Sequence, residues 1–92
     1  MNTINKPKLT YRTNKVDKAI KIHEMPRKQL VQLYLDIMQY ENTGEKSLAL
    51  REYYRNATRV ARNYVHGVAN WEMLVKESIL LEVITRLMEG VL

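Results

Sequence analysis

The sequence predicts an all-α protein of one domain. We expect a short N-terminal helix, an antiparallel helical hairpin and a C-terminal helical extension, assembled into a homo-oligomer. Apolar residues recur at the three- and four-residue spacing of a helix in each segment. Turn-forming residues separate the segments, at Pro26, residues 42–44 and Gly67. The 92 residues form one domain, residues 1–92. Such a chain buries only about 60–65% of its unfolded surface, so a monomer would be marginally stable and subunit contacts would help.

Residues 1–13 are polar and basic and show no helical periodicity, so an extended segment is expected there. Asn14 can cap a short helix, with Asp17 at its third position, where a carboxylate complements the free amides and the helix dipole. This helix should end near Met25, because the residue before Pro26 is disfavoured in the helical region.

Residues 26–66 predict the hairpin. Pro26 suits the first position of a helix, and Gly44 can adopt the left-handed conformation that ends one. The first helix carries an apolar stripe of Leu30, Leu33, Tyr34, Ile37 and Met38. The second helix, residues 45–66, carries an apolar face of Leu50, Tyr53, Ala57, Val60, Ala61 and Tyr64. A connection of three residues directs the second helix back antiparallel to the first.

The opposite face of the second helix holds a row of cations: Arg51, Arg55, Arg59, Arg62 and His66. A cationic face on a surface helix is often a solvated face that keeps a protein soluble. Alternatively the row binds anions, because arginine offers a planar fork of donors that suits phosphodiesters. Both interpretations stay open from the spacing alone.

Residues 68–89 predict a C-terminal helix. Gly67 favours a break before it, Asn70 is an available cap, and Gly90 ends the pattern. Apolar residues occupy nearly every side of this helix: Trp71, Met73, Leu74, Val75, Ile79, Leu80, Leu81, Val83, Ile84, Leu87 and Met88.

Only two pairs in this helix look like exposed pairs four residues apart, Glu72 with Lys76 and Glu82 with Arg86. A helix that is apolar all round is buried all round. A chain this short cannot surround such a helix alone, so we expect it to hold the subunits of a homo-oligomer together. The alternative is a poorly soluble tail packed loosely on the hairpin.

The net charge of +5 is concentrated in the N-terminal third of the chain. Residues 1–28 carry the cations Lys6, Lys8, Arg12, Lys15, Lys18, Lys21, Arg27 and Lys28 against the anions Asp17 and Glu24. This excess indicates a polyanionic partner such as nucleic acid, a nucleotide or an acidic protein, or else a solubilising tail.

The residue inventory argues against most enzyme and metal-binding classes. The chain has no cysteine and only two histidines, so neither a disulfide framework nor a metal site is expected. It contains no glycine-rich phosphate loop, HExxH or nucleophile elbow, so no catalytic residue and no cofactor are predicted. No apolar run approaches the ~20 residues of a membrane span, and no secretory signal is recognisable, so we expect a soluble cytoplasmic protein without a membrane partner.

Groups suited to binding nucleotides are better supplied. Tyr11 beside Arg12 offers a ring for stacking and a cation, and Arg27 and Lys28 follow at a helix N-terminus. A helix N-terminus also presents free amides to an anion. Packing of the Tyr11 ring on the hairpin, and simple exposure of Arg27 and Lys28, are the structural alternatives.

The run GEKSLAL at residues 44–50, between two long helices, resembles the helical hairpin of phage anti-CBASS cyclic-oligonucleotide sponges. Anti-Thoeris sponges share that hairpin. His23, Glu24 and Arg27 also stand where such hairpins often carry HE and R. The resemblance covers residues 11–65, with the departure that residues 58–60, Thr-Arg-Val, replace a tryptophan-containing run.

This resemblance implies a helical oligomer, in the family a hexamer, that holds cyclic dinucleotides between its subunits. It implies that Tyr11 stacks on a base and that Arg27 or Lys28 contacts a phosphate; the spacing does not decide between these two cations. It also implies a separate site for cyclic trinucleotides in some members, and Arg59 and Arg62 are further candidates for ligand contacts.

The expected function is therefore sequestration of cyclic di- or oligonucleotide messengers, without cleavage, in the cytoplasm of an infected bacterium. Such a sponge would block CBASS-type antiviral signalling and would form no stable complex with DNA or RNA. The alternatives are a small basic DNA- or RNA-binding helical protein and a helical inhibitor of a host protein.

Overall fold

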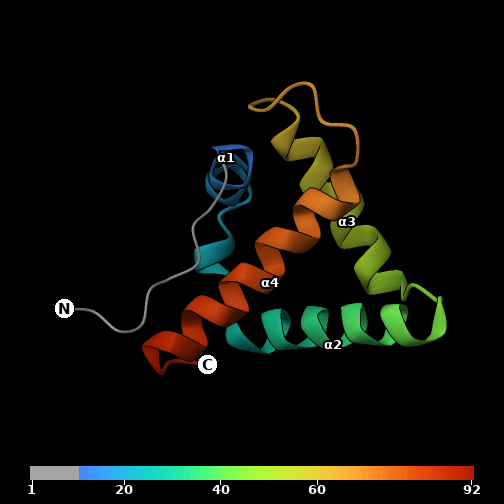
Figure 1. Ribbon diagram of the computed structural model, residues 1–92, viewed down its shortest axis with the longest axis vertical. Coiled ribbons are helices and arrows are strands. Elements are labelled where there is room, and N and C mark those ends of the chain that lie inside the picture. Colours follow the sequence, from blue (N-terminus) through green and yellow to red (C-terminus); the bar gives the residue numbers. More distant parts are fainter. Residues whose placement is uncertain (1–10) are drawn as a thin grey trace.

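The computed structural model describes residues 11–92, with side chains from Lys15 onward. Its elements in chain order are α1 (Tyr11–Ile20), the short 3-10 turn η1 (Ile22–Glu24), α2 (Arg27–Thr43), α3 (Leu48–Ala61) and α4 (Trp71–Glu89). Helices are the only regular elements in this range, which confirms the predicted all-α class (Figure 1). None of the described helices is long and apolar enough to cross a membrane.

The N-terminal helix begins earlier than predicted. Residues 11–13 are helical rather than extended, and Asn14 lies inside α1 instead of capping it. The prediction of an extended segment at residues 1–10 falls outside the described residues. The helix also ends before Met25, because Lys21 takes a left-handed conformation with φ 54°. This turn lets Ile22 enter the core, where it is 1% exposed.

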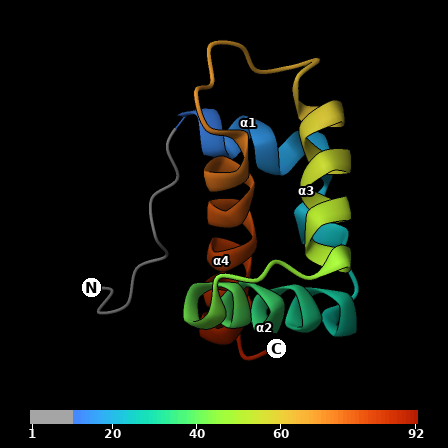
Figure 2. The ribbon, with the colours of Figure 1, turned by 90° about the vertical axis from the view of Figure 1, so that its right-hand side faces the viewer.

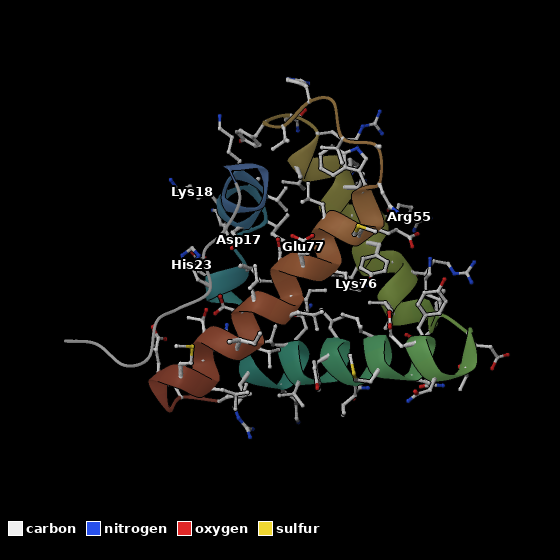
Figure 3. The ribbon with its side chains drawn as sticks, viewed as in Figure 1. Asp17, Lys18, His23, Arg55, Lys76 and Glu77 are labelled. Atoms are coloured by element: carbon white, nitrogen blue, oxygen red, sulfur yellow. The ribbon has the colours of Figure 1, made fainter. Side chains whose placement is uncertain are left out.

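Asp17 points from α1 toward α4, whereas its neighbour Lys18 points away from the other helices (Figure 3). Its Oδ1 atom is buried without a hydrogen-bond partner, and so is the hydroxyl of Tyr53 on α3. The burial of these groups raises the pKa of Asp17 above its ordinary value and that of Tyr53 to about 12. A carboxyl group at this position therefore opposes folding when it is ionised.

The turn between α2 and α3 contains Gly44 as predicted, but it spans residues 44–47 instead of 42–44, so α3 begins at Leu48 rather than at residue 45. Gly44 is left-handed, with φ 77°, and its amide donates to the carbonyl of Tyr40 at 2.8 Å. Ser47 then caps α3 by accepting from the amide of Leu50 at 3.1 Å. The Ser47 hydroxyl also donates to the buried carboxylate of Asp36 at 3.0 Å, which ties the start of α3 to α2.

The predicted antiparallel hairpin is wrong in its packing. Figures 1 and 2 show α2 and α3 diverging steeply from the turn, so they do not lie side by side along their length. The physical reason is α4, which packs against α1, α2 and α3. The main core joins η1, α2, α3 and α4 through Ile22, Leu30, Leu33, Ile37, Leu50, Tyr54, Ala57, Val75, Ile79 and Val83.

The second helix of the predicted hairpin, α3, is also shorter than predicted and buries a partly different set of residues. It ends at Ala61 rather than His66, and Gly67, with φ 72°, lies in the loop that follows. Val60 and Tyr64, expected inside, are 40% and 61% exposed. Tyr54 is buried in their place, because α3 contacts α1 and α4 as well as α2.

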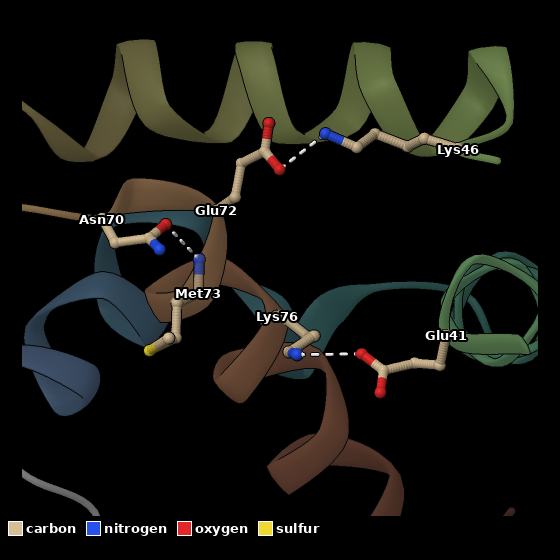
Figure 4. Close-up of polar contacts among 6 residues, drawn as sticks. All are labelled: Glu41, Lys46, Asn70, Glu72, Met73 and Lys76. Carbon is tan, nitrogen blue, oxygen red and sulfur yellow. Dashed lines mark hydrogen bonds and ion pairs between the residues drawn. The ribbon is translucent and has the colours of Figure 1, made fainter. Parts of the chain in front are cut away.

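The C-terminal helix has the predicted cap and the predicted end, but it begins at Trp71 instead of residue 68 and has only one buried face. Asn70 accepts from the amide of Met73 at 3.0 Å (Figure 4), and Gly90 is left-handed with φ 73°. The buried face comprises Val75, Ser78, Ile79, Val83 and Arg86. Large apolar side chains remain exposed elsewhere on α4, at Met73, Ile84, Leu87 and Met88.

The predicted exposed pairs within α4 need correction. Glu72 pairs with Lys46 at 2.6 Å instead of with Lys76, and Lys76 pairs with Glu41 at 3.2 Å (Figure 4). Both contacts tie α4 to other parts of the fold. The pair of Glu82 and Arg86 does form, at 2.8 Å, but their side chains are only 13% and 11% exposed. It is therefore an interior contact.

Candidate anion-binding groove

The arginines of α3 line a groove against the first turn of α4. The groove has a volume of about 530 Å³, within the range of about 300–1,000 Å³ typical of small-molecule sites. Its lining comprises Arg51, Tyr54, Arg55, Thr58, Arg59, Arg62, Trp71 and Glu72, and we call it the arginine groove. It combines cations, aromatic rings, a hydroxyl and one carboxylate.

Two elements build this groove. The lining residues between Arg51 and Arg62, the last of which caps α3, follow one another at spacings of one or three positions, so they share one side of the helix. Trp71 is the first residue of α4 and packs against the small cluster of Val16, Ala61 and Val65. The core therefore holds the indole where α3 and α4 meet.

The positive charge of the arginine groove is not neutralised by its surroundings. None of its four arginines forms an ion pair within the described part of the chain. Arg59 donates only to the side-chain oxygen of Asn56, at 3.3 Å, and Arg55 extends outward from α3 (Figure 3). The guanidinium groups are available to an anion.

Two of the groove's lining residues, Tyr54 and Glu72, contact Lys46, which lies outside the lining. The Nζ atom of Lys46 lies 5.3 Å from the ring centre of Tyr40 and 5.6 Å from that of Tyr54. Burial, helped by the carboxylates of Glu72 and Glu41, raises the pKa of Tyr54 to about 12. Tyr54 is therefore a neutral phenol at physiological pH and adds no negative charge to the groove.

The structure divides the predicted site residues among three places. Arg59 and Arg62 lie in the arginine groove. Arg27 and Lys28 are exposed at the start of α2, where Arg27 borders an apolar groove formed with Leu87 near the end of α4. Trp71 and Leu87 are 16 positions apart on α4, or about 24 Å at 1.5 Å per residue. Within one chain, the two basic pairs do not form a single site.

Tyr11 and Arg12 form the first turn of α1, but their side chains lie outside the described residues. The predicted stacking of Tyr11 on a base therefore stays a prediction. His66, the last member of the predicted cation row, is exposed in the loop after α3 and does not line the arginine groove.

Sequence reasoning missed Tyr54, Thr58, Trp71 and Glu72 as site residues. The helical period from Arg51 points to Tyr54 and Thr58, which lie three and seven positions further on. No comparable signal marks Trp71 and Glu72, because they reach the groove only through the packing of α4 on α3.

Chemically, the arginine groove offers charge-assisted hydrogen bonds for an anion and a ring for stacking on a planar group. Among the described residues, no group of three His, Asp or Glu side chains could hold a metal ion. Comparisons with protein-family models, curated proteins and solved structures find no match to this chain.

Proposed function

We propose that this protein binds cyclic di- and oligonucleotide second messengers and sequesters them without cleaving them. The arginine groove carries the proposal. Four guanidinium groups suit the two phosphodiesters of a cyclic dinucleotide, and the Trp71 indole suits a base. The resemblance of residues 11–65 to the anti-CBASS sponges is a second ground for the proposal, and it rests on the sequence, since α2 and α3 do not pack as the antiparallel hairpin of that family. The setting is then the cytoplasm of an infected bacterium, where removal of the messenger silences an effector that the protein never touches.

Sequestration rather than turnover follows from the residue inventory. Cleaving a phosphodiester needs a metal ion, or a positioned base and nucleophile. The sequence contains none of the motifs that usually supply them. One protein should therefore neutralise only as many messengers as it has sites.

Assembly into a homo-oligomer, a hexamer by the resemblance, is part of the same proposal. The apolar side chains exposed on α4 continue onto α2, where Leu35 is 52% exposed beside Leu87 at 61%. A surface of this kind is typical of a contact between subunits. Such a contact would also allow Tyr11 of one subunit to meet Arg27 or Lys28 of another, as the resemblance implies.

Calorimetry with 3′,3′-cyclic GMP-AMP and two charge-matched variants tests the site. Arg59→Gln with Arg62→Gln removes two charges from the arginine groove and should weaken binding about ten-fold or more, through lost charge-assisted hydrogen bonds. Arg27→Gln with Lys28→Gln removes the same charge from the start of α2, where the resemblance implies a phosphate contact, and so compares the two candidate sites.

The outcomes separate the alternatives. Loss of affinity confined to the Arg27 and Lys28 variant would move the site to the start of α2. Recovery of linear nucleotide after heat denaturation of the loaded protein would make it an enzyme. If no cyclic nucleotide binds while duplex DNA or RNA does, with an affinity that falls steeply as salt rises, the nucleic-acid alternative replaces this function.

A further inference from the structure

One carboxylate lines the arginine groove among four arginines. Glu72 stands in the first turn of α4, and its side chain is 53% exposed. Its Oε1 atom accepts from Lys46 at 2.6 Å (Figure 4), while its Oε2 atom makes no hydrogen bond or ion pair within the described residues. A fixed negative charge weakens phosphate binding, so a groove that served only for anions would gain nothing from it.

The position of Glu72 gives it a different use. It follows Trp71 directly, and both side chains line the same groove. A base stacked on the indole would bring its edge toward neighbouring polar groups of the lining. The Lys46 ammonium donates to Oε1 of Glu72, which keeps a further lone pair, and Oε2 stays open, so both oxygens can accept from a ligand. The ion pair orients the carboxylate before the ligand arrives.

The chemistry of the bases then decides which of them fits. A carboxylate is an acceptor only. Guanine offers two neighbouring donors on its Watson–Crick edge, the N1–H and the amino group at C2. Adenine offers one amino group beside the acceptor N1, whose lone pair a carboxylate repels. Cytosine likewise pairs one donor with an acceptor, and uracil has a single N–H between two carbonyls.

We propose that the arginine groove selects guanine nucleotides, with Trp71 stacking on the base and Glu72 accepting from its Watson–Crick edge. The inference rests on the proposed function and deepens it by naming the preferred base. The arginines then bind the phosphates of the ligand, and the Glu72 carboxylate binds its base.

Cyclic di-GMP and cyclic di-AMP test this inference, because they share one backbone and differ only in the base. The unmodified protein should bind cyclic di-GMP roughly ten-fold more tightly, the order expected for one well-made pair of hydrogen bonds to a base. Glu72→Gln replaces one acceptor with a donor. It should weaken cyclic di-GMP, strengthen cyclic di-AMP and bring the two affinities close together.

Lys46→Met is the matched control. Both variants lose the ion pair between Lys46 and Glu72, but only Glu72→Gln loses the acceptor. Lys46→Met loses the orientation of the carboxylate but keeps the acceptor, so the preference for guanine should be reduced and still present, whereas Glu72→Gln should lose it. Thermal unfolding should show both variants folded. If Glu72→Gln keeps the full preference for guanine, the inference is overturned.

The binding results distinguish a failure of guanine selection from a failure of the proposed sequestration. Equal binding of both dinucleotides to the unmodified protein refutes guanine selection and leaves sequestration intact. Absence of binding to either dinucleotide, and to cyclic GMP-AMP, refutes the proposed function and this inference together.

Discussion

Replacing Arg86 with methionine should destabilise the fold more than any other single loss of charge discussed for this protein. Its guanidinium donates to the Glu82 carboxylate at 2.8 Å and to the carbonyl of Met25 at 2.7 Å. Longer contacts of 3.4 Å reach the carbonyls of Ile22 and His23. One side chain of α4 thus fastens the junction between α1 and α2, more than sixty residues away in the sequence.

The magnitude follows from what the substitution leaves behind. Glu82 is 13% exposed, so removing its partner strands a buried carboxylate at a cost of about 3–5 kcal/mol. Two short hydrogen bonds from a charged donor, at about 1.5–3 kcal/mol each, lead to a similar sum. Since domains have total stabilities of about 5–15 kcal/mol, Arg86→Met should remove a large fraction of the free energy of unfolding.

Urea unfolding followed by circular dichroism measures this loss. Glu82→Gln combined with Arg86→Met should recover about 1–2 kcal/mol relative to Arg86→Met alone, because the stranded charge is gone. Lys76→Met breaks the more exposed pair with Glu41 and should cost less than about 1 kcal/mol. If Arg86→Met unfolds at the urea concentration of the parent protein, the interior role of Arg86 is refuted.

Three further predictions concern the helix junctions and the exposed surface. Burial, together with the Glu82 carboxylate, raises the pKa of Asp17, so the contribution of this carboxyl group to stability is most favourable below its ordinary pKa of 3.8 and falls as the pH rises from there to the raised folded-state pKa. Asp17→Asn should therefore gain about 1 kcal/mol at neutral pH and nothing in acid, and a constant gain in urea titrations at both pH values would contradict this. Ser47→Ala removes a cap and a partner of Asp36, so it should lower the free energy of unfolding by about 1–2 kcal/mol, whereas an unchanged urea midpoint would show both contacts to be dispensable. Leu87→Asp should leave the helical content unchanged but reduce the mass measured by light scattering, because its side chain is 61% exposed in one chain; a parent protein that is already monomeric would refute the proposed assembly.

Local chemistry alone determined several features, and these are predicted correctly from the sequence. Gly44 and Gly90 end helices because a left-handed backbone costs glycine little. Asn70 caps α4 because its side-chain oxygen reaches the amide of Met73, three residues ahead. The row of arginines from Arg51 to Arg62 likewise needs only the period of one helix.

The choice of buried faces depended on the tertiary structure. Helical periodicity predicted that Val60 and Tyr64 are buried, but the packing of α3 against α1 and α4 buries Tyr54 instead. Arg86 looked like an exposed partner of Glu82, since the carbonyls that enclose it belong to a distant part of the chain. Helical spacing shows which residues share one face of a helix. It does not show which neighbouring helix packs against that face.

The candidate site divides in the same way. The sequence by itself determined that Arg59 and Arg62 share one side of α3. Only the tertiary structure brought Trp71 and Glu72 to them, because α4 returns to α3 after the loop and packs its first turn beside Ala61 and Val65. A groove needs two surfaces, and the contact between those surfaces comes from burial of apolar side chains along α4 rather than from the spacing of the charged residues that line it.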